Sequence, residues 1–180
     1  MVKVILFGDK NDTSLTLPLC RCLERHGGVF YISDGCISEY SNTSPSFIVI
    51  ESDSIENFNA EGSIFILKSP KSVKKILALN SENNYVVTEY SKALDTIREA
   101  SNIPIIRCSS GNMGDVTLSS LNESSACVGI EHSITTLLGK KLEPCEFKVD
   151  LGSDICGYPL LAVCCVLILS EKNNGYALNI

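Results

Sequence analysis

Polar side chains that could bind a ligand follow four apolar segments of the chain. Residues 2–7, 29–33, 47–50 and 103–108 are followed by "GDKNDTS", Asp34, Glu51 and "SSGN". Ligands of open parallel sheets bind beyond the carboxyl ends of the strands, so these are the places where a site is expected. The candidate ligand-binding residues are Gly8, Asp9, Lys10, Asn11, Thr13, Ser14, Asp34, Glu51, Ser109, Ser110, Gly111 and Asn112.

The first of these segments stands between an apolar strand and a helix, where many α/β proteins hold a phosphate. A phosphate loop needs glycines, which let successive backbone N–H groups turn inward, and a lysine at the start of the helix. Here Gly8 is the one glycine before Thr13, Asp12 precedes Thr13 directly, and Asp9 and Asp12 would repel a triphosphate. The alternatives are a turn with an Asx or Thr cap, a non-hydrolysing ligand site, and an acidic metal- or partner-binding surface.

The last segment, Ser109 to Asn112, could present hydroxyl and N–H groups to an anion or a carboxylate. The alternative is a turn that needs only the geometry of its glycine. Cys108 would act as a nucleophile only beside a base or a cation. His132 is the candidate base, because His26 lies at the end of the first predicted helix that points away from this edge.

Composition restricts the class of protein. With 180 residues, 44% hydrophobic and 20% charged, the chain is long enough for one well-buried domain. A net charge of −6 without a block of Lys and Arg argues against nucleic-acid binding. The nine cysteines contain no C-x-x-C pair, so we expect no metal site, and most of them should be buried hydrophobic residues.

Location and fold follow from the hydrophobic patterning. "MVKVILFGD" lacks the features of a signal peptide, which predicts a cytoplasmic protein with reduced thiols. The longest apolar run, Leu160 to Leu169, is about half of what a bilayer crossing needs, so it is expected in the core. Short continuous runs rich in Val and Ile predict strands covered on both faces. They span residues 2–7, 29–33, 47–50, 63–67, 85–88 and 103–108.

Helices are predicted between these strands. Apolar residues at helical spacing indicate helices that begin near Thr16, after the cap Ser69, near residue 91 and near Tyr158. Residues 116–121, 125–130 and 145–151 read as short antiparallel strands. The predicted fold is therefore α/β, a three-layer, mostly parallel, Rossmann-like or P-loop-like sheet with a β-rich C-terminal extension. We divide it into an α/β core (1–114), the extension (115–151) and a closing helical segment (152–180), all within one compact domain.

The first 80 residues resemble the ParA/MinD-type P-loop ATPases. The similar stretches are "KVILFGDKNDTSLTLPLCRCLERHGGVFYISD", "PSFIVIESDS" and "AEGSIFILKSPKSVKKI". The resemblance implies that Lys10 stands at the signature lysine, Thr13 or Ser14 at the magnesium-binding hydroxyl, and Asp34 and Glu51 at the two acidic positions. Pro18 and the missing glycines depart from the family pattern, because the helix starts later and the phosphate cradle is incomplete.

Three functions are compatible with these observations. The leading hypothesis is a non-catalytic or regulatory P-loop-like domain that acts through a protein partner or a homodimer, with no cofactor and no ATP hydrolysis. The second is an α/β enzyme or a binder of small anionic ligands that uses the carboxyl edge of the strands. The third is a structural subunit in which residues 116–151 expose strand edges that pair between chains. The motifs G-x-S-x-G, H-E-x-x-H and G-x-G-x-x-G are absent from the sequence.

Overall fold

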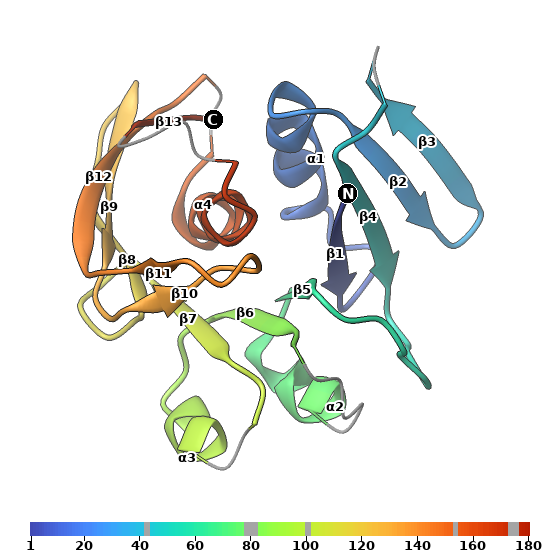
Figure 1. Ribbon diagram of the computed structural model, residues 1–180, viewed down its shortest axis with the longest axis horizontal. Helices are drawn as coiled ribbons and strands as arrows, with labels where there is room; N and C mark the ends of the chain where they lie inside the picture. The colour runs from blue at the N-terminus through green and yellow to red at the C-terminus, as the bar shows by residue number, and fades with distance from the viewer. Residues whose placement is uncertain (42–43, 78–82, 100–101, 153–154, 173–176) are drawn as a thin grey trace.

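A continuous eleven-stranded sheet forms the frame of the protein in the computed structural model (Figure 1). The structure describes residues 1–41, 44–77, 83–99, 102–152, 155–172 and 177–180. The strands of the large sheet are β1 (Val2–Phe7), β2 (Val29–Ser33), β3 (Cys36–Tyr40), β4 (Phe47–Ser52), β5 (Ser63–Leu67), β6 (Tyr85–Glu89), β7 (Ile105–Ser109), β8 (Val116–Leu121), β9 (Ser125–Ile130), β12 (Cys145–Asp150) and β13 (Ala177–Asn179). A separate hairpin consists of β10 (Ile134–Thr135) and β11 (Lys141–Leu142).

The strand order across the sheet is β13-β12-β9-β8-β7-β6-β5-β1-β4-β2-β3. From β8 to β2 all neighbouring strands are parallel. The pairs β2–β3, β8–β9 and β9–β12 are antiparallel, and β13 is parallel to β12. The connecting helices are α1 (Thr16–Arg25), α2 (Val73–Leu77), α3 (Ala93–Glu99) and α4 (Gly157–Leu169), with a 3₁₀ turn η1 (Pro70–Ser72) before α2. The mostly parallel α/β fold is confirmed.

Both faces of the central strands are buried, which produces the three layers. Successive side chains of a strand point to opposite faces. On β1, Val4 and Leu6 pack with α1 and α4, while Ile5 and Phe7 pack with α2 and α3. This is why the strands read as continuous apolar runs in the sequence.

Helix α4 is buried over almost its whole length. Every residue from Leu160 to Leu169 is buried, and none is charged. A helix that is apolar all round has no face to turn to water, so it must be enclosed. Figure 1 shows the sheet curving around α4, with α1 beside it and with α2 and α3 outside the curve. In the described part of the chain, no helix is long and apolar enough to cross a membrane.

The β-rich extension continues the main sheet. Strand β8 lies between β7 and β9, β9 lies between β8 and β12, and β12 lies between β9 and β13. The free strand edges expected for residues 116–151 are therefore not found in these three strands. Among the strands that the structure describes, β3 and β13 are the outermost of the large sheet. Strands β3, β10, β11 and β13 were not predicted. The division into three segments remains a prediction, and residues 100 and 101 of the third predicted helix lie outside the described part.

Candidate functional site

The place where a ligand is expected lies between the carboxyl ends of β1 and β5. Helix α1 follows β1 on the concave face of the sheet, and α2 follows β5 on the other face. Such a reversal opens a crevice at the carboxyl ends of the two strands. Gly8 stands at the end of β1 and Lys68 at the end of β5, with Glu51 on the neighbouring β4.

The Lys68 side chain fills this crevice. Its side chain is only 2% exposed, and its ammonium group donates to the carbonyl oxygen of Asp9 at 2.8 Å, to that of Asp12, and to Glu51 Oε1. A lysine ammonium has three N–H donors and no acceptor. Each donor therefore has a partner, and the ammonium has none left for a ligand.

Glu51 is buried and held on both of its oxygens. Its side chain is 4% exposed, and Oε1 accepts a second hydrogen bond from Thr16 Oγ1 at 2.8 Å. Tyr31 donates its hydroxyl to Oε2. Burial, followed by this hydrogen bond, raises the pKa of Tyr31 to about 12, so the phenol stays protonated as the donor. Glu51 thus joins α1, β2 and β4 to the end of β5.

Two side-chain turns shape the loop between β1 and α1. Asp9 Oδ1 accepts from the N–H of Asn11 at 2.9 Å, and Asp12 Oδ1 accepts from the N–H of Ser14 at 3.0 Å. The bonds from Ser14 lower the pKa of Asp12, which keeps this carboxylate ionised. The carbonyl oxygens of Asp9 and Asp12 face the Lys68 ammonium, whereas a phosphate loop presents N–H groups.

Gly8 permits the close passage of the lysine stem. Its φ is +144°, and a Cβ at this position would stand 2.7 Å from Lys68 Cβ. A side chain here would force the stem out of the crevice. The space beside Gly8 that a phosphate would need is therefore taken by Lys68, and the residues present do not fit a nucleotide phosphate.

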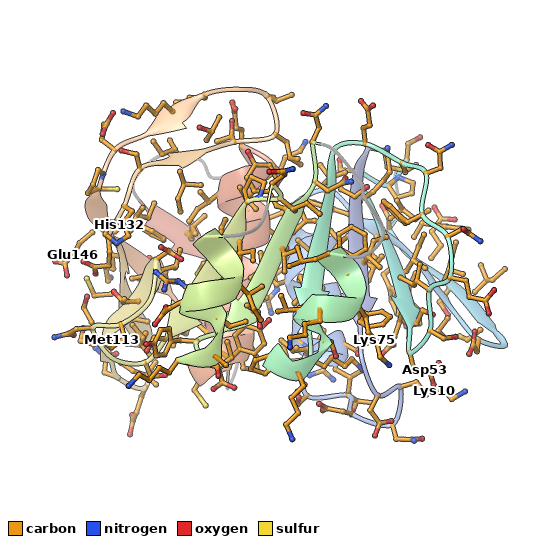
Figure 2. The ribbon with its side chains drawn as sticks, turned by 90° about the horizontal axis from the view of Figure 1, so that it is seen from below. Lys10, Asp53, Lys75, Met113, His132 and Glu146 are labelled. Atoms are coloured by element: carbon orange, nitrogen blue, oxygen red, sulfur yellow. The ribbon has the colours of Figure 1, made fainter. Side chains whose placement is uncertain are left out.

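The other candidates from the first loop lie at the surface. Lys10 is half-exposed and forms long ion pairs with Asp34 at 3.5 Å and Asp53 at 4.0 Å. Figure 2 shows Lys10 and Asp53 side by side on the outside of the molecule. Thr13 and Ser14 are exposed, and the hydroxyl that reaches Glu51 belongs to Thr16.

The Ser109–Asn112 loop lies on the same edge but far from Gly8. Strands β5 and β6 separate β1 from β7, which corresponds to about 14 Å at the usual spacing of strands. Ser109 Oγ accepts from the N–H of Gly111 at 3.1 Å. Asp115, after this loop, accepts from the backbone N–H of Arg107 at 3.0 Å and from its Nε at 2.9 Å. The structure thus brings Gly8 and Glu51 together and leaves this loop apart.

Cys108 is enclosed in the core. It is 0% exposed, and its Sγ lies 3.7 Å from Cys165 Sγ. Burial raises the pKa of Cys108 well above its ordinary value, which keeps the thiol protonated and unreactive. His132 is exposed and lines a cavity of about 350 Å³, together with Tyr85 and Pro104 near the amino ends of β6 and β7. The condition for a nucleophilic Cys108, a base or a cation beside its thiol, is not met by the contact that the structure shows for this thiol, which is with Cys165.

The residue that decides the chemistry of the loop was missed by sequence reasoning. Lys68 follows the strand at 63–67 just as Glu51 follows the strand at 47–50, and this position was the available signal. Thr16 and Tyr31 lie within a helix and a strand, where nothing in the sequence marks them. Across the described ranges, no group of three or more His, Cys, Asp or Glu side chains is placed to hold a metal ion.

The buried ion pair predicts a large loss of stability when one partner is changed. In Glu51→Gln, the Lys68 ammonium would stay buried without a counter-charge, and the free energy of unfolding should fall by about 3 to 5 kcal/mol. Asp53→Asn removes an exposed partner of Lys10 and should cost less than about 1 kcal/mol. Urea unfolding followed by circular dichroism measures both values. Equal losses in the two variants would contradict the assigned role of Glu51.

A pH dependence follows from Cys20, which is buried near Glu51. Burial, and then the Glu51 carboxylate, raise the pKa of the Cys20 thiol from 9.0 to about 12. Above pH 9 the unfolded chain releases this proton while the folded chain keeps it, so stability present below pH 9 is lost as the pH rises towards 12. Cys20 should contribute up to about 1.4 kcal/mol per pH unit to this loss.

Urea unfolding at several pH values between 9 and 12 tests this dependence. The decline should be shallower in Cys20→Ala than in the wild type. It should keep its wild-type slope in Cys145→Ala, because Cys145 is exposed. Identical slopes in all three proteins would contradict the prediction.

Comparisons with known proteins find similarity of fold alone. No protein-family model matches the chain, and no curated protein matches it. MurF ligase from Thermotoga maritima, solved in complex with ADP, is similar with a TM-score of 0.57 at 14% identity, over 97% of this chain and 47% of that one. The murein peptide ligase Mpl from Psychrobacter arcticus gives a TM-score of 0.56 at 11% identity, over 94% and 44%. MurF from Acinetobacter baumannii gives 0.53 at 12%, over 95% and 44%.

The chain spans about half the length of these ligases. At such identities the similarity concerns the arrangement of helices and strands, and the resemblance to ParA/MinD-type ATPases remains a prediction. The chain therefore shares its α/β, Rossmann-like or P-loop-like fold with the Mur ligases.

Proposed function

We propose that this chain is a non-hydrolysing domain of the P-loop-like type that acts by associating with a second copy of itself. The observation that supports the absence of hydrolysis is the Lys68 ammonium in the crevice between β1 and β5. In this architecture the crevice is where a nucleotide would bind. A chain that closes it with its own side chain has no place there for ATP.

Opening the crevice would be costly. A phosphate would have to displace Lys68, which would leave Glu51 buried without its counter-charge, and removal of one partner from a buried pair costs about 3 to 5 kcal/mol. The incoming phosphate would also meet the carbonyl oxygens of Asp9 and Asp12 instead of N–H donors. Both effects oppose nucleotide binding, and they act before any catalytic step.

Strand β3 supports association because it forms a free edge of the sheet. An edge strand presents unpaired N–H and C=O groups that can pair with another strand. The apolar residues Ile37 and Tyr40 on β3 are 70% and 40% exposed. Pairing of this edge with another strand would remove apolar surface of both residues from water.

Antiparallel pairing with a second copy places no like charges directly opposite each other at this edge. If two β3 strands pair antiparallel about Ser38, Ile37 stands opposite Glu39 of the other copy, and Cys36 stands opposite Tyr40. Glu39 therefore faces an uncharged residue, and the destabilising effect of directly opposed like charges is avoided. The Ile37 side chains lie diagonally across the two-fold axis, within reach of each other.

The first test concerns nucleotides. Thermal unfolding with ATP, ADP or GTP, each with magnesium, should give the same Tm as magnesium alone. A nucleotide present at one hundred times its Kd would raise the Tm by about 5 to 10 °C. A rise of that size that disappears in Lys10→Ala would overturn the proposal and favour the nucleotide role implied for Lys10.

The second test concerns self-association. Sedimentation velocity should show a dimer for the wild type and a monomer for Ile37→Lys, because a charge on an edge strand blocks strand pairing. Leu17→Lys is the matched control, since Leu17 is a 52% exposed apolar residue on α1, away from β3. A wild type that stays monomeric at high concentration contradicts the association through β3.

A further inference from the structure

We infer that the loop from Gly8 to Thr16, together with Glu51, is a binding site for a primary alkylammonium group, which Lys68 occupies in the folded chain. The site goes beyond the proposed function, because it concerns the class of ligand that the loop accepts. It predicts that removal of the Lys68 side chain leaves a pocket for a short free amine.

The oxygen atoms around Lys68 Nζ define the site. The Asp9 carbonyl lies at 2.8 Å, and the Asp12 carbonyl and Glu51 Oε1 complete the set. Thr16 Oγ1 donates to the same Glu51 oxygen at 2.8 Å and so holds it in place. All the groups directed at the centre are acceptors, which makes the site attractive to a cation and repulsive to an anion.

The number of acceptors favours an ammonium over a metal ion. Three oxygens match the three N–H donors of an ammonium. Calcium takes six to eight oxygens, and magnesium is held through one or two carboxylates with several waters, whereas this site has one carboxylate and two carbonyl oxygens around an enclosed ammonium. Glu51 is the one carboxylate among the three acceptors, and its single negative charge matches the single positive charge of an ammonium.

Gly8 supplies the second half of the site, which receives the carbon chain. An added Cβ at Gly8 would lie 2.7 Å from Lys68 Cβ and 3.3 Å from Lys68 Cγ, so the glycine backbone forms the wall along which the stem runs. A ligand should therefore combine a charged head with an unbranched alkyl chain. The ammonium ion has no carbon chain and would therefore make no contact with the Gly8 backbone.

Chemical rescue of Lys68→Ala tests the inference. This variant lacks Cγ, Cδ, Cε and Nζ, which n-propylammonium replaces atom for atom. The Tm of the variant should fall by about 10 °C, as expected for an unpaired buried carboxylate in a chain of this size. Added n-propylammonium should restore at least half of this loss.

The controls separate charge from shape. 1-Propanol and propionate should not restore the Tm of Lys68→Ala, since one lacks the charge and the other has the opposite sign. Lys68→Met keeps an apolar chain in the pocket and should not respond to n-propylammonium, nor should the wild type. Equal rescue by 1-propanol, a lack of rescue by the amine, or a larger stabilisation of Lys68→Ala than of the wild type by inorganic phosphate would each overturn the inference.

A measurement on the wild type covers the case in which Lys68→Ala does not fold. Reductive methylation of the folded protein, followed by peptide mass spectrometry, should modify Lys10, whose side chain is 53% exposed, and spare Lys68. Modification of Lys68 as fast as Lys10 would show that the ammonium is not enclosed. Both experiments are independent of the oligomeric state, so failure of the β3 dimer leaves this inference unaffected.

Discussion

The buried pair of Lys68 and Glu51 holds together the carboxyl edge of the sheet. Moving two charges out of water is expensive, and the pair is tolerated only because its hydrogen-bonding groups are satisfied. Glu51 takes donors from Thr16, Tyr31 and Lys68, and Lys68 takes acceptors from the loop after β1. Five segments therefore meet at one ion pair: the loop, α1, β2, β4 and β5. Their relative positions are fixed by hydrogen-bond geometry as well as by packing.

Helix α4 imposes the second constraint. Because α4 is apolar on all sides, every side must be shielded from water, and a flat sheet could shield only one side. The sheet satisfies this need by curving and by adding β8, β9, β12 and β13 beyond the parallel strands (Figure 1). Helix α1 closes the remaining side. The two constraints are linked, because Thr16, which holds Glu51, is also the first residue of α1.

The sequence predicts well the elements that are determined by residues close together in the chain. The parallel strands and the start of α1 follow from apolar runs and from the position of Pro18. Strand β3 was missed because its side chains are mostly exposed and carry no apolar pattern, although Asp34 and Gly35, with a φ of +79° at the glycine, form a pair typical of hairpin turns. The Lys68–Glu51 pair was missed for a different reason. It joins residues 17 positions apart, on two strands separated by β1, and only the strand order brings them together.

The polarity of a strand–loop–helix junction is set by its backbone and by its neighbours, not by its place in the fold. The junction after β1 stands at the position of a phosphate loop because it connects β1 to α1 at the carboxyl edge of the sheet. The loop directs carbonyl oxygens inward because Asp9 and Asp12 stabilise its turns, and Lys68, which follows β5, supplies the cation that these oxygens face. The Lys68 side chain, paired with Glu51, makes the crevice part of the buried core. Similarity of fold to an ADP-bound ligase therefore does not determine which groups this loop presents.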